Sequence, residues 1–418
     1  MEGMEKRTPE RAILAGLDAG VFTRQETATE ETLSELEALL ETAGGTCVGT
    51  LLQSRPAPDP HSFLGEGKAE ELHRAVEATG ADMVIFDNDL SPSQIRSLEQ
   101  ITGVTVIDRS ALILDIFAQR AKTREGRLQV ELAQYQYLLP RLSGMGASLS
   151  RQGGGIGTRG PGETRLETDR RHIRERIAKL RQELKEVRRV RGVQRQLREK
   201  NSVPVVALVG YTNAGKSTLL NALTGAGIPA NNRLFDTLDT TTRHLTVSDT
   251  LEVLLSDTVG FIAKLPHHLV EAFQATLEEL SYADLLLHVI DASDPNREDH
   301  MAVVERLVQE LAPQNVPIIE VYNKADLART EDIPVGENKI AISAATGTNL
   351  SGLLELIEQN LDTGVARVNL LLPYSAAGEL DRLHREAKVF RAEYENDGIR
   401  VDAALNRELQ GRYRAYIK

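Results

Sequence analysis

The first 110 residues alternate short apolar runs with amphipathic stretches, and this pattern predicts a small, mostly parallel α/β domain. Leucines on one face of the first amphipathic stretch are typical of a helix that packs on a sheet. Ser91-Pro92 is a good start for a helix, because serine caps and proline fits the first helical position. The expected strands are 12–17, 47–52, 83–86 and 104–107, and the expected helices are 29–42, 68–78 and 91–101.

From residue 111 onward the apolar positions recur at steps of three and four, which is typical of paired helices. One apolar seam covers 111–139 and ends at Pro140, and a second seam covers 173–187. Two long helices with facing seams and one connection predict an antiparallel helical hairpin over residues 111–201.

The connection of this hairpin, residues 143–164, contains the run Gly-Gly-Gly-Ile-Gly-Thr-Arg-Gly-Pro-Gly. The run satisfies G-x-G-x-x-G, but no apolar strand precedes it, which argues against a dinucleotide-binding site. Two interpretations stay open: a loop that follows RNA phosphates, and a plain flexible connector.

Basic side chains gather in the hairpin. Residues 119–201 hold 21 basic and 9 acidic side chains, a net charge of +12, whereas the parts before and after each carry −12. Such an asymmetry favours contact with a polyanion, and the alternative is a solvated helix face. The expected RNA contacts are Arg151, Arg159, Arg165, Arg174, Arg181 and Arg188.

Residues 202–365 contain a phosphate-binding motif. The apolar run 205–209 leads into Gly210-x-x-x-x-Gly215-Lys216-Ser217, and a helical pattern follows. This strand, G-x-x-x-x-G-K-[ST], helix order is the setting that a P-loop requires. Its backbone N–H groups and the helix N-terminus would hold phosphates, Lys216 would reach the β- and γ-phosphates, and Ser217 would bind Mg²⁺.

A second motif, Asp257-Thr-Val-Gly260, follows another apolar strand. We expect Asp257 to hold Mg²⁺ through water and the Gly260 amide to meet the γ-phosphate, so that loss of this phosphate releases the segment after it.

The last two motifs, Asn323-Lys-Ala-Asp326 and Ser343-Ala-Ala345, predict selection of guanine. Asp326 would accept hydrogen bonds from guanine N1–H and the N2 amino group, and a backbone N–H near Ala344 or Ala345 would donate to O6. Adenine matches neither, so the wrong base leaves buried polar groups unpaired. Lys324 would lie along the base plane, and Asn323 would brace the loops.

Together the four motifs predict a GTPase that converts GTP and water to GDP and phosphate. The expected GTP-binding residues are Gly210, Tyr211, Thr212, Asn213, Ala214, Gly215, Lys216, Ser217, Thr218, Phe235, Thr237, Leu238, Asp239, Asp257, Thr258, Val259, Gly260, Asn323, Lys324, Asp326, Ser343, Ala344 and Ala345.

Three features near the expected phosphate site bear on the mechanism of hydrolysis. Thr237 is the first choice for a second Mg²⁺ ligand, with Thr241 and Thr242 as alternatives. Phe261 stands where many small GTPases carry a glutamine that orients water, so the catalytic residue is unknown and intrinsic hydrolysis should be slow. Asn213 matches a pattern in GTPases that recruit K⁺; the alternative is an asparagine that stabilises the loop.

Residues 366–418 predict a small α+β appendage, with a strand at 368–372, a helix capped by Ser375 and a hairpin turn at Asn396-Asp-Gly. At 418 residues the chain is long enough for several domains, which we place at 1–110, 111–201, 202–365 and 366–418. The predicted fold class is α/β: a P-loop domain, with helices on both faces of a mostly parallel sheet, between the other parts.

The composition of the chain bears on the cellular compartment in which the protein works. The single cysteine, Cys47, has no partner for an internal disulfide and favours a reducing, cytoplasmic setting. No run approaches the roughly 18 apolar residues of a membrane span, and the acidic start of the chain lacks the apolar core of a signal peptide.

The four motifs, the basic hairpin and the N-terminal domain together resemble the HflX family of ribosome-associated GTPases. The glycine run with its Glu-Thr extension, and Ile107-Asp-Arg-Ser-Ala-Leu-Ile-Leu-Asp-Ile-Phe-Ala-Gln-Arg-Ala, are the specific part of a likeness that covers nearly the whole chain. The resemblance implies GTP-dependent binding to the large ribosomal subunit and splitting or rescue of stalled ribosomes under stress. It also implies that the glycine loop and basic helices approach ribosomal RNA near the peptidyl transferase centre, a target that a +12 hairpin suits.

Other functions stay open from the sequence. A GTPase with this hairpin could act in ribosome assembly, tRNA modification or membrane traffic, although we find no modification-enzyme motif and no membrane anchor. An RNA-binding scaffold could hold the nucleotide for structure only. The appendage could contact the ribosome or simply pack on the GTPase domain.

Overall fold

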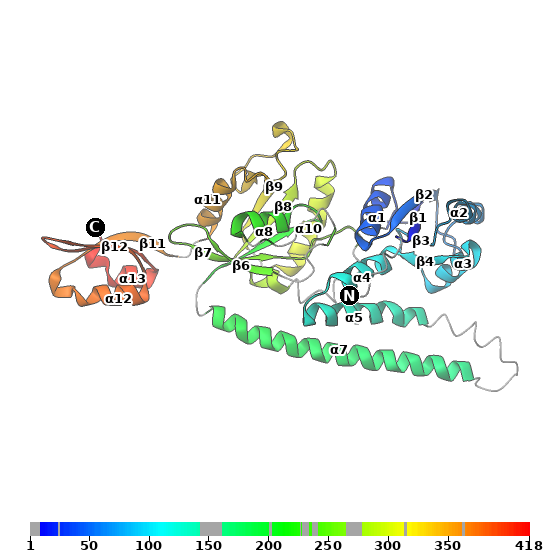
Figure 1. Cartoon of the computed structure of the whole chain (residues 1–418), viewed down its shortest axis with the longest axis horizontal. Coiled ribbons are helices and arrows are strands. Elements are labelled where there is room, and N and C mark those ends of the chain that lie inside the picture. Colours follow the sequence, from blue (N-terminus) through cyan, green and yellow to red (C-terminus); the bar gives the residue numbers. More distant parts are fainter. Residues whose placement is uncertain are drawn as a thin grey trace, which may run out of the picture.

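The computed structural model describes residues 9–23, 26–142, 161–199, 203–225, 227, 234–235, 241–264, 278–312, 316–361 and 364–418. Figure 1 shows the three sheets in a row, with the C-terminal sheet at the left. A long helix runs beneath the central and N-terminal sheets. The N-terminal and central sheets belong to α/β layers, and the C-terminal sheet is small and antiparallel. The α/β fold class is therefore as predicted.

The N-terminal sheet is all parallel, with the strand order β2-β1-β3-β4. Helices α1 and α4 (Arg109–Arg120) cover one face of the sheet, and α2 and α3 cover the other. Ser91 caps α3 by accepting a hydrogen bond from the Gln94 N–H, as the Ser-Pro signal predicts. The elements are β1 (Arg11–Ala19), α1 (Glu30–Ala43), β2 (Thr46–Arg55), α2 (Glu66–Thr79), β3 (Met83–Phe86), α3 (Pro92–Thr102) and β4 (Thr105–Asp108).

The helical hairpin differs from its prediction at the start. The expected single helix from Ala111 is two helices, α4 (Arg109–Arg120) and α5 (Arg124–Leu142), and α4 packs on the N-terminal sheet. The regular three-and-four spacing hid this break, because α4 has its own apolar face toward α1. Pro140 does not end the helix either, since α5 continues to Leu142.

The facing seams are confirmed. Helix α7 (Pro161–Glu199) lies antiparallel beside α5 (Figure 1), and Leu128 and Leu132 pack against Ile177, Leu180 and Leu184. Arg176 and Glu131 join the two helices with an ion pair of 2.7 Å. Because α7 begins at Pro161, the expected glycine-rich connection is shorter at its end than predicted.

The central sheet has the order β10-β9-β8-β5-β7-β6 and is parallel except for its edge strand β6. Strand β5 lies in the middle, and its apolar run is buried on both faces, as expected. Helices α8 and α11 cover one face and α10 covers the other. The elements are β5 (Val205–Gly210), α8 (Lys216–Thr224), β6 (Thr241–Thr246), β7 (Glu252–Asp257), η2 (Glu278–Tyr282), β8 (Leu285–Asp291), α10 (Arg297–Leu311), β9 (Ile318–Asn323), η3 (Thr330–Asp332), β10 (Lys339–Ala341) and α11 (Leu350–Asn360).

The C-terminal part is a three-stranded antiparallel sheet, β11-β13-β12, with the predicted hairpin between β12 and β13. Ser375 does not cap a helix: it lies inside the short helix η4, and α12 begins at Gly378 without a side-chain cap. Arg367 reaches Asp249 of the central part at 3.0 Å. The elements are β11 (Ala366–Leu372), η4 (Tyr374–Ala376), α12 (Gly378–Glu386), β12 (Lys388–Glu395), β13 (Gly398–Leu405), α13 (Arg407–Arg412) and η5 (Arg414–Tyr416).

A shared apolar cluster joins the N-terminal part to the central part. The Phe117 ring of α4 meets the Phe235 ring edge-to-face at 4.7 Å, and Phe261 and Ile262 are buried in the same cluster. The first two residues after the second motif therefore lie between the two sheets. In the described parts of the chain, we find no helix with the length and hydropathy to cross a bilayer.

Candidate nucleotide-binding site

The P-loop connects β5 to α8 at the carboxyl edge of the central sheet. Gly215 has φ +94°, and a Cβ there would lie 2.2 Å from Asn323 Nδ2, so only glycine fits this turn. Lys216 is the first residue of α8, and its Nζ donates to the Gly210 carbonyl at 3.0 Å and the Tyr211 carbonyl at 2.8 Å. These bonds hold the ammonium group over the loop where a phosphate would enter.

Burial lowers the pKa of Lys216 to about 8, and the Asp257 carboxylate partly opposes this effect. A bound phosphate would add negative charge beside the ammonium group and favour its protonated form. The charged form of Lys216 is therefore costly to bury in the empty loop, and an anionic ligand would offset this cost.

Ser217, the second residue of α8, and Asp257, the last residue of β7, lie together at the carboxyl edge of the central sheet. The Ser217 hydroxyl donates to Asp257 Oδ2 at 2.8 Å. Hydroxyl and carboxylate oxygens are the ligands that Mg²⁺ prefers, and P-loop GTPases use Mg²⁺ with the nucleotide. The pair fits that ion: Ser217 would be a direct ligand, and Asp257 would act through water.

Asn323 braces three loops, as the sequence predicts. Its Nδ2 donates to the Ala214 carbonyl of the P-loop at 2.9 Å, and its Oδ1 accepts from the Ala344 N–H at 2.9 Å. The P-loop and both guanine-selection motifs are thus held at the same edge of the sheet.

The other residues of this motif differ in exposure. Asp326 is exposed at the end of β9, open to a ligand. Lys324 has φ +59° and forms an ion pair of 2.6 Å with Asp291 at the end of β8. The stem of Lys324 is therefore fixed beside the loops rather than extended into water.

Two predicted positions have side chains turned toward protein. Phe261 is 2 % exposed, and its ring lies in the cluster between the two sheets, so it does not face the phosphates. Phe235, which we expected in the GTP pocket, packs on Phe117 instead, because a large apolar ring gains more from burial than from a polar pocket. Asn213 is exposed with φ +62°, a backbone conformation that asparagine tolerates well.

Several expected residues lie outside the part of the chain that the structure describes. Thr237, Leu238 and Asp239 lie outside the described residues, as do Arg151 and Arg159; the side chains of Arg165 and Arg188 also lie outside the description. Thr241 and Thr242 lie in β6, where Thr241 pairs with Asp257. Arg174 and Arg181 are exposed on α7.

Sequence reasoning missed a buried polar cluster beside the P-loop. Arg109 bonds Asp87 at 2.8 Å and also contacts Glu35, while Lys264 contacts Asp87. The Tyr211 hydroxyl donates to Glu35 Oε1 at 2.5 Å. The members of this cluster are far apart in the sequence and form no motif. The bulky Tyr211, directly after the first P-loop glycine, was the signal that could have pointed to a contact at this place.

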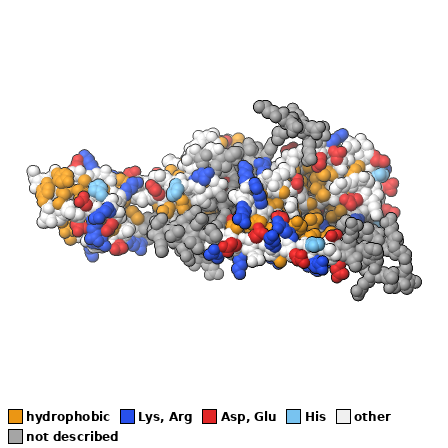
Figure 2. Space-filling view, turned by 60° about the horizontal axis from the view of Figure 1, so that its bottom comes forward, with side chains coloured by type: hydrophobic (Ala, Val, Ile, Leu, Met, Phe, Trp, Pro, Cys, Tyr) orange, Lys and Arg blue, Asp and Glu red, His pale blue; other side chains and the backbone are white. Residues whose placement is uncertain are grey.

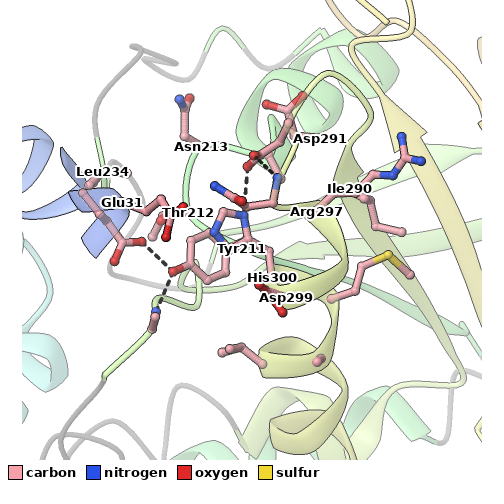
Figure 3. Close-up of a pocket in the computed structure, with 18 of the residues that line it drawn as sticks. Glu31, Tyr211, Thr212, Asn213, Leu234, Ile290, Asp291, Arg297, Asp299 and His300 are labelled. Carbon is pink, nitrogen blue, oxygen red and sulfur yellow. Dashed lines mark hydrogen bonds and ion pairs between the residues drawn. The ribbon is translucent and has the colours of Figure 1, made fainter. Parts of the chain in front are cut away.

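A pocket of about 620 Å³ opens next to this cluster, between α1, the P-loop and α10. Figure 3 shows the Tyr211 ring stacked on His300, with centroids 3.7 Å apart, and the hydrogen bonds at its hydroxyl. The lining includes Tyr211–Ala214 but not Lys216 or Ser217, so this space adjoins the phosphate site without being it.

Comparison with known proteins agrees with this geometry. Three family models match in chain order: "GTP-binding GTPase N-terminal" over residues 30–118, "GTP-binding GTPase Middle Region" over 120–198 and "50S ribosome-binding GTPase" over 205–324. GTPase HflX of Caldanaerobacter subterraneus subsp. tengcongensis is 50% identical over 412 residues, which cover 98% of this chain and 94% of that protein. The chain belongs to the HflX family of GTPases.

Other relatives span similar lengths. GTPase HflX of Escherichia coli (strain K12) is 46% identical over 374 residues and 88% of each chain. A solved structure of a GTP-binding protein from Sulfolobus solfataricus in complex with GDP is 24% identical, with a TM-score of 0.44, and the match covers 83% of this chain and 98% of that one. As an HflX-family GTPase, the protein uses its P-loop for GTP hydrolysis.

Proposed function

We propose that this HflX-family GTPase binds the large ribosomal subunit in its GTP-bound state and splits or rescues stalled ribosomes under stress. The observation that carries the proposal is the match of residues 205–324 to a family described as a 50S ribosome-binding GTPase. It is supported by the basic hairpin that precedes this domain, since ribosomal RNA is a dense polyanion.

An exposed basic face on the described part of α7 supports contact with RNA. Arg174, Lys179, Arg181 and Lys185 are exposed on it, while the apolar seam faces α5. Figure 2 shows Lys and Arg side chains along the face where the hairpin comes forward, with acidic side chains between them. We propose that Arg174 and Arg181 contact RNA phosphates, together with Arg151, Arg159, Arg165 and Arg188.

Co-sedimentation with isolated ribosomal subunits tests the proposal. We expect the protein to pellet with large subunits in a non-hydrolysable GTP analogue and to stay in the supernatant with GDP. Lys216→Ala should abolish nucleotide-dependent capture. Pelleting that ignores the nucleotide, or a preference for small subunits or assembly intermediates, would contradict it.

Variants that remove the charges distinguish two interpretations of the basic residues: contact with RNA, and a helix face that only faces water. Arg174→Gln with Arg181→Gln should weaken capture and reduce its salt dependence by about two phosphate contacts. The matched control, Arg11→Gln with Arg74→Gln, removes two exposed charges from the N-terminal part, outside the hairpin, and should leave capture unchanged. Equal behaviour of both double variants would show that α7 does not contact RNA.

We also propose that Asn213 recruits K⁺ beside the phosphates, where a monovalent cation would supply the charge of an arginine finger. Asn213 is exposed at the mouth of the P-loop, which suits a shared cation site. GTP turnover should be higher in KCl than in NaCl, and Asn213→Ala should remove that difference. Equal turnover of the natural protein in both salts would refute the idea.

A further inference from the structure

A carboxylate outside the four motifs lies beside the lysine of the first guanine-selection motif. Asp291 is the last residue of β8 and pairs with Asn323, the last residue of β9, in a parallel register. Its Oδ2 lies 2.6 Å from the Nζ of Lys324, and the side chains of Asp291 and Lys324 are 20 % and 24 % exposed. Asp291 also lines the pocket drawn in Figure 3, together with Asn213 of the P-loop. This ion pair therefore lies at the carboxyl edge of the sheet, where open α/β sheets bind ligands.

The carboxylate of Asp291 is held in place by the turn that follows it. Its Oδ1 accepts a hydrogen bond from the Ser293 N–H at 3.0 Å and another from the Ser293 hydroxyl at 2.6 Å. An aspartate that bonds the backbone two residues further on stabilises a local turn. One oxygen of Asp291 therefore fixes the side chain, while the other meets the ammonium group of Lys324.

The same turn is bonded to the backbone of the guanine-selection motif and to the segment that follows this motif. The Ala292 N–H donates to the Asn323 carbonyl at 2.9 Å. Arg297, the first residue of α10, donates to the Ala292 carbonyl at 3.3 Å and to the Asp332 carbonyl at 2.6 Å. Backbone contacts therefore set the position of the turn relative to the motif, independently of the ion pair.

Lys324 has a backbone conformation that lysine rarely adopts. Its φ of +59° lies in the left-handed region, which persists for such a residue only where the surroundings enforce it. The Ala325 N–H donates to the Ile342 carbonyl at 3.0 Å, and the Leu327 N–H donates to the Lys324 carbonyl at 2.9 Å. These bonds fix the start of the Lys324 side chain, and Asp291 fixes its end. The apolar stem between the two ends is thus ordered before a nucleotide binds.

We propose that Asp291 is a positioning residue for guanine nucleotides, which holds Lys324 so that the stem of this lysine forms a preformed surface for one face of the base. A lysine side chain without such a partner samples many rotamers, and binding then has to order it at the expense of affinity. The ion pair with Asp291 moves this ordering from the binding step to folding. The proposal rests on guanine recognition by residues 323–326 and not on the ribosomal role.

Titration of the full chain with fluorescent GDP, in the absence of ribosomes, tests the proposal. Asp291→Asn keeps an oxygen for the bonds from Ser293 but removes the charge that holds Lys324. It should weaken GDP binding by about three- to tenfold, which is the effect of having to order one long side chain. A non-hydrolysable GTP analogue should lose affinity by the same factor, because it carries the same base. Inorganic pyrophosphate has no base and should bind the variant and the natural protein equally well, whereas a general defect of the loops would weaken its binding too.

A second variant tests whether Asp291 acts through Lys324. Lys324→Met keeps an apolar stem without the ammonium group and should weaken GDP binding at least as much as Asp291→Asn does. Adding Asp291→Asn to Lys324→Met should cause no further loss, because the two residues act as a pair. The matched control is Glu320→Gln, which breaks an ion pair of 2.7 Å with Lys339 in the same sheet and should leave the affinities for GDP and pyrophosphate unchanged.

Three results would overturn the proposal: natural GDP affinity in Asp291→Asn, an equal loss of pyrophosphate binding, or additive losses in the double variant. None of these measurements involves ribosomes, so the proposal can fail while nucleotide-dependent capture by large subunits holds.

Discussion

The Ser217 hydroxyl donates a hydrogen bond to Asp257 Oδ2 at 2.8 Å, although 40 residues separate them. The pairing of β5 with β7 places the P-loop beside Asp257, the first residue of the second motif, so two oxygen atoms suited to one hard cation meet. Mg²⁺-dependent nucleotide binding should therefore require both side chains, which come from two different segments of the chain.

Ser217→Ala should therefore weaken Mg²⁺-dependent GTP binding by roughly 10- to 100-fold, the range that loss of support at a metal site produces. With EDTA present, the variant and the natural protein should bind nucleotide alike. Fluorescent nucleotide titrations across Mg²⁺ concentrations measure this. Thr224→Ala, which removes a hydroxyl bonded within α8 to the Leu220 carbonyl, serves as control; a Mg²⁺ dependence that survives in Ser217→Ala would exclude Ser217 as a ligand.

If Asp326 recognises guanine as proposed, replacing its carboxylate should change the base preference. Asp326→Asn replaces an acceptor by a donor, and GTP affinity should fall about 10²- to 10⁴-fold, since each hydrogen bond to a charged group contributes about 1.5–3 kcal/mol. The new amide matches the C2 carbonyl of xanthine, so the variant should prefer xanthosine triphosphate. Competition binding with both nucleotides checks this, and unchanged GTP affinity would mean that Asp326 does not contact the base.

Asn323 should matter to both nucleotides equally, because it braces the loops rather than touching phosphate. Asn323→Ala removes two buried hydrogen bonds and should lower the free energy of unfolding by about 1–3 kcal/mol. GDP and GTP-analogue affinities should fall by the same factor. Asn360→Ala, which removes bonds at the end of α11, is the control; a selective loss of the triphosphate would argue against a bracing role.

His288 makes the fold sensitive to acid. Burial in β8 lowers the pKa of His288 from 6.5 to about 4, so the folded state binds fewer protons than the unfolded state between these values. Stability is then complete above pH 6.5 and is lost as the pH falls toward 4. Chemical denaturation at pH 7 and pH 5 should show the natural protein losing about 2 kcal/mol more than His288→Gln. Equal losses would show that His288 is protonated in the folded state.

Much of the molecule follows from short-range patterns. The order of strand, loop and helix around Gly215 and Lys216, the guanine motifs at strand ends and the alternation before residue 110 all depend on spacing within a few residues. The regular spacing of apolar residues also predicted the facing seams of α5 and α7. It could not place the break between α4 and α5, because α4 has a regular apolar face of its own but packs on a different neighbour.

What the sequence by itself determined is the chemistry of the nucleotide pocket and the kind of fold that carries it, because local spacing and apolar period specify both. Only the tertiary structure decided where the segment after Gly260 is held. Lys264 meets Asp87 across 177 positions, and Tyr211 meets Glu35 across 176. No local pattern marks such pairs, because their burial and charge balance arise only when two sheets far apart in the sequence come together.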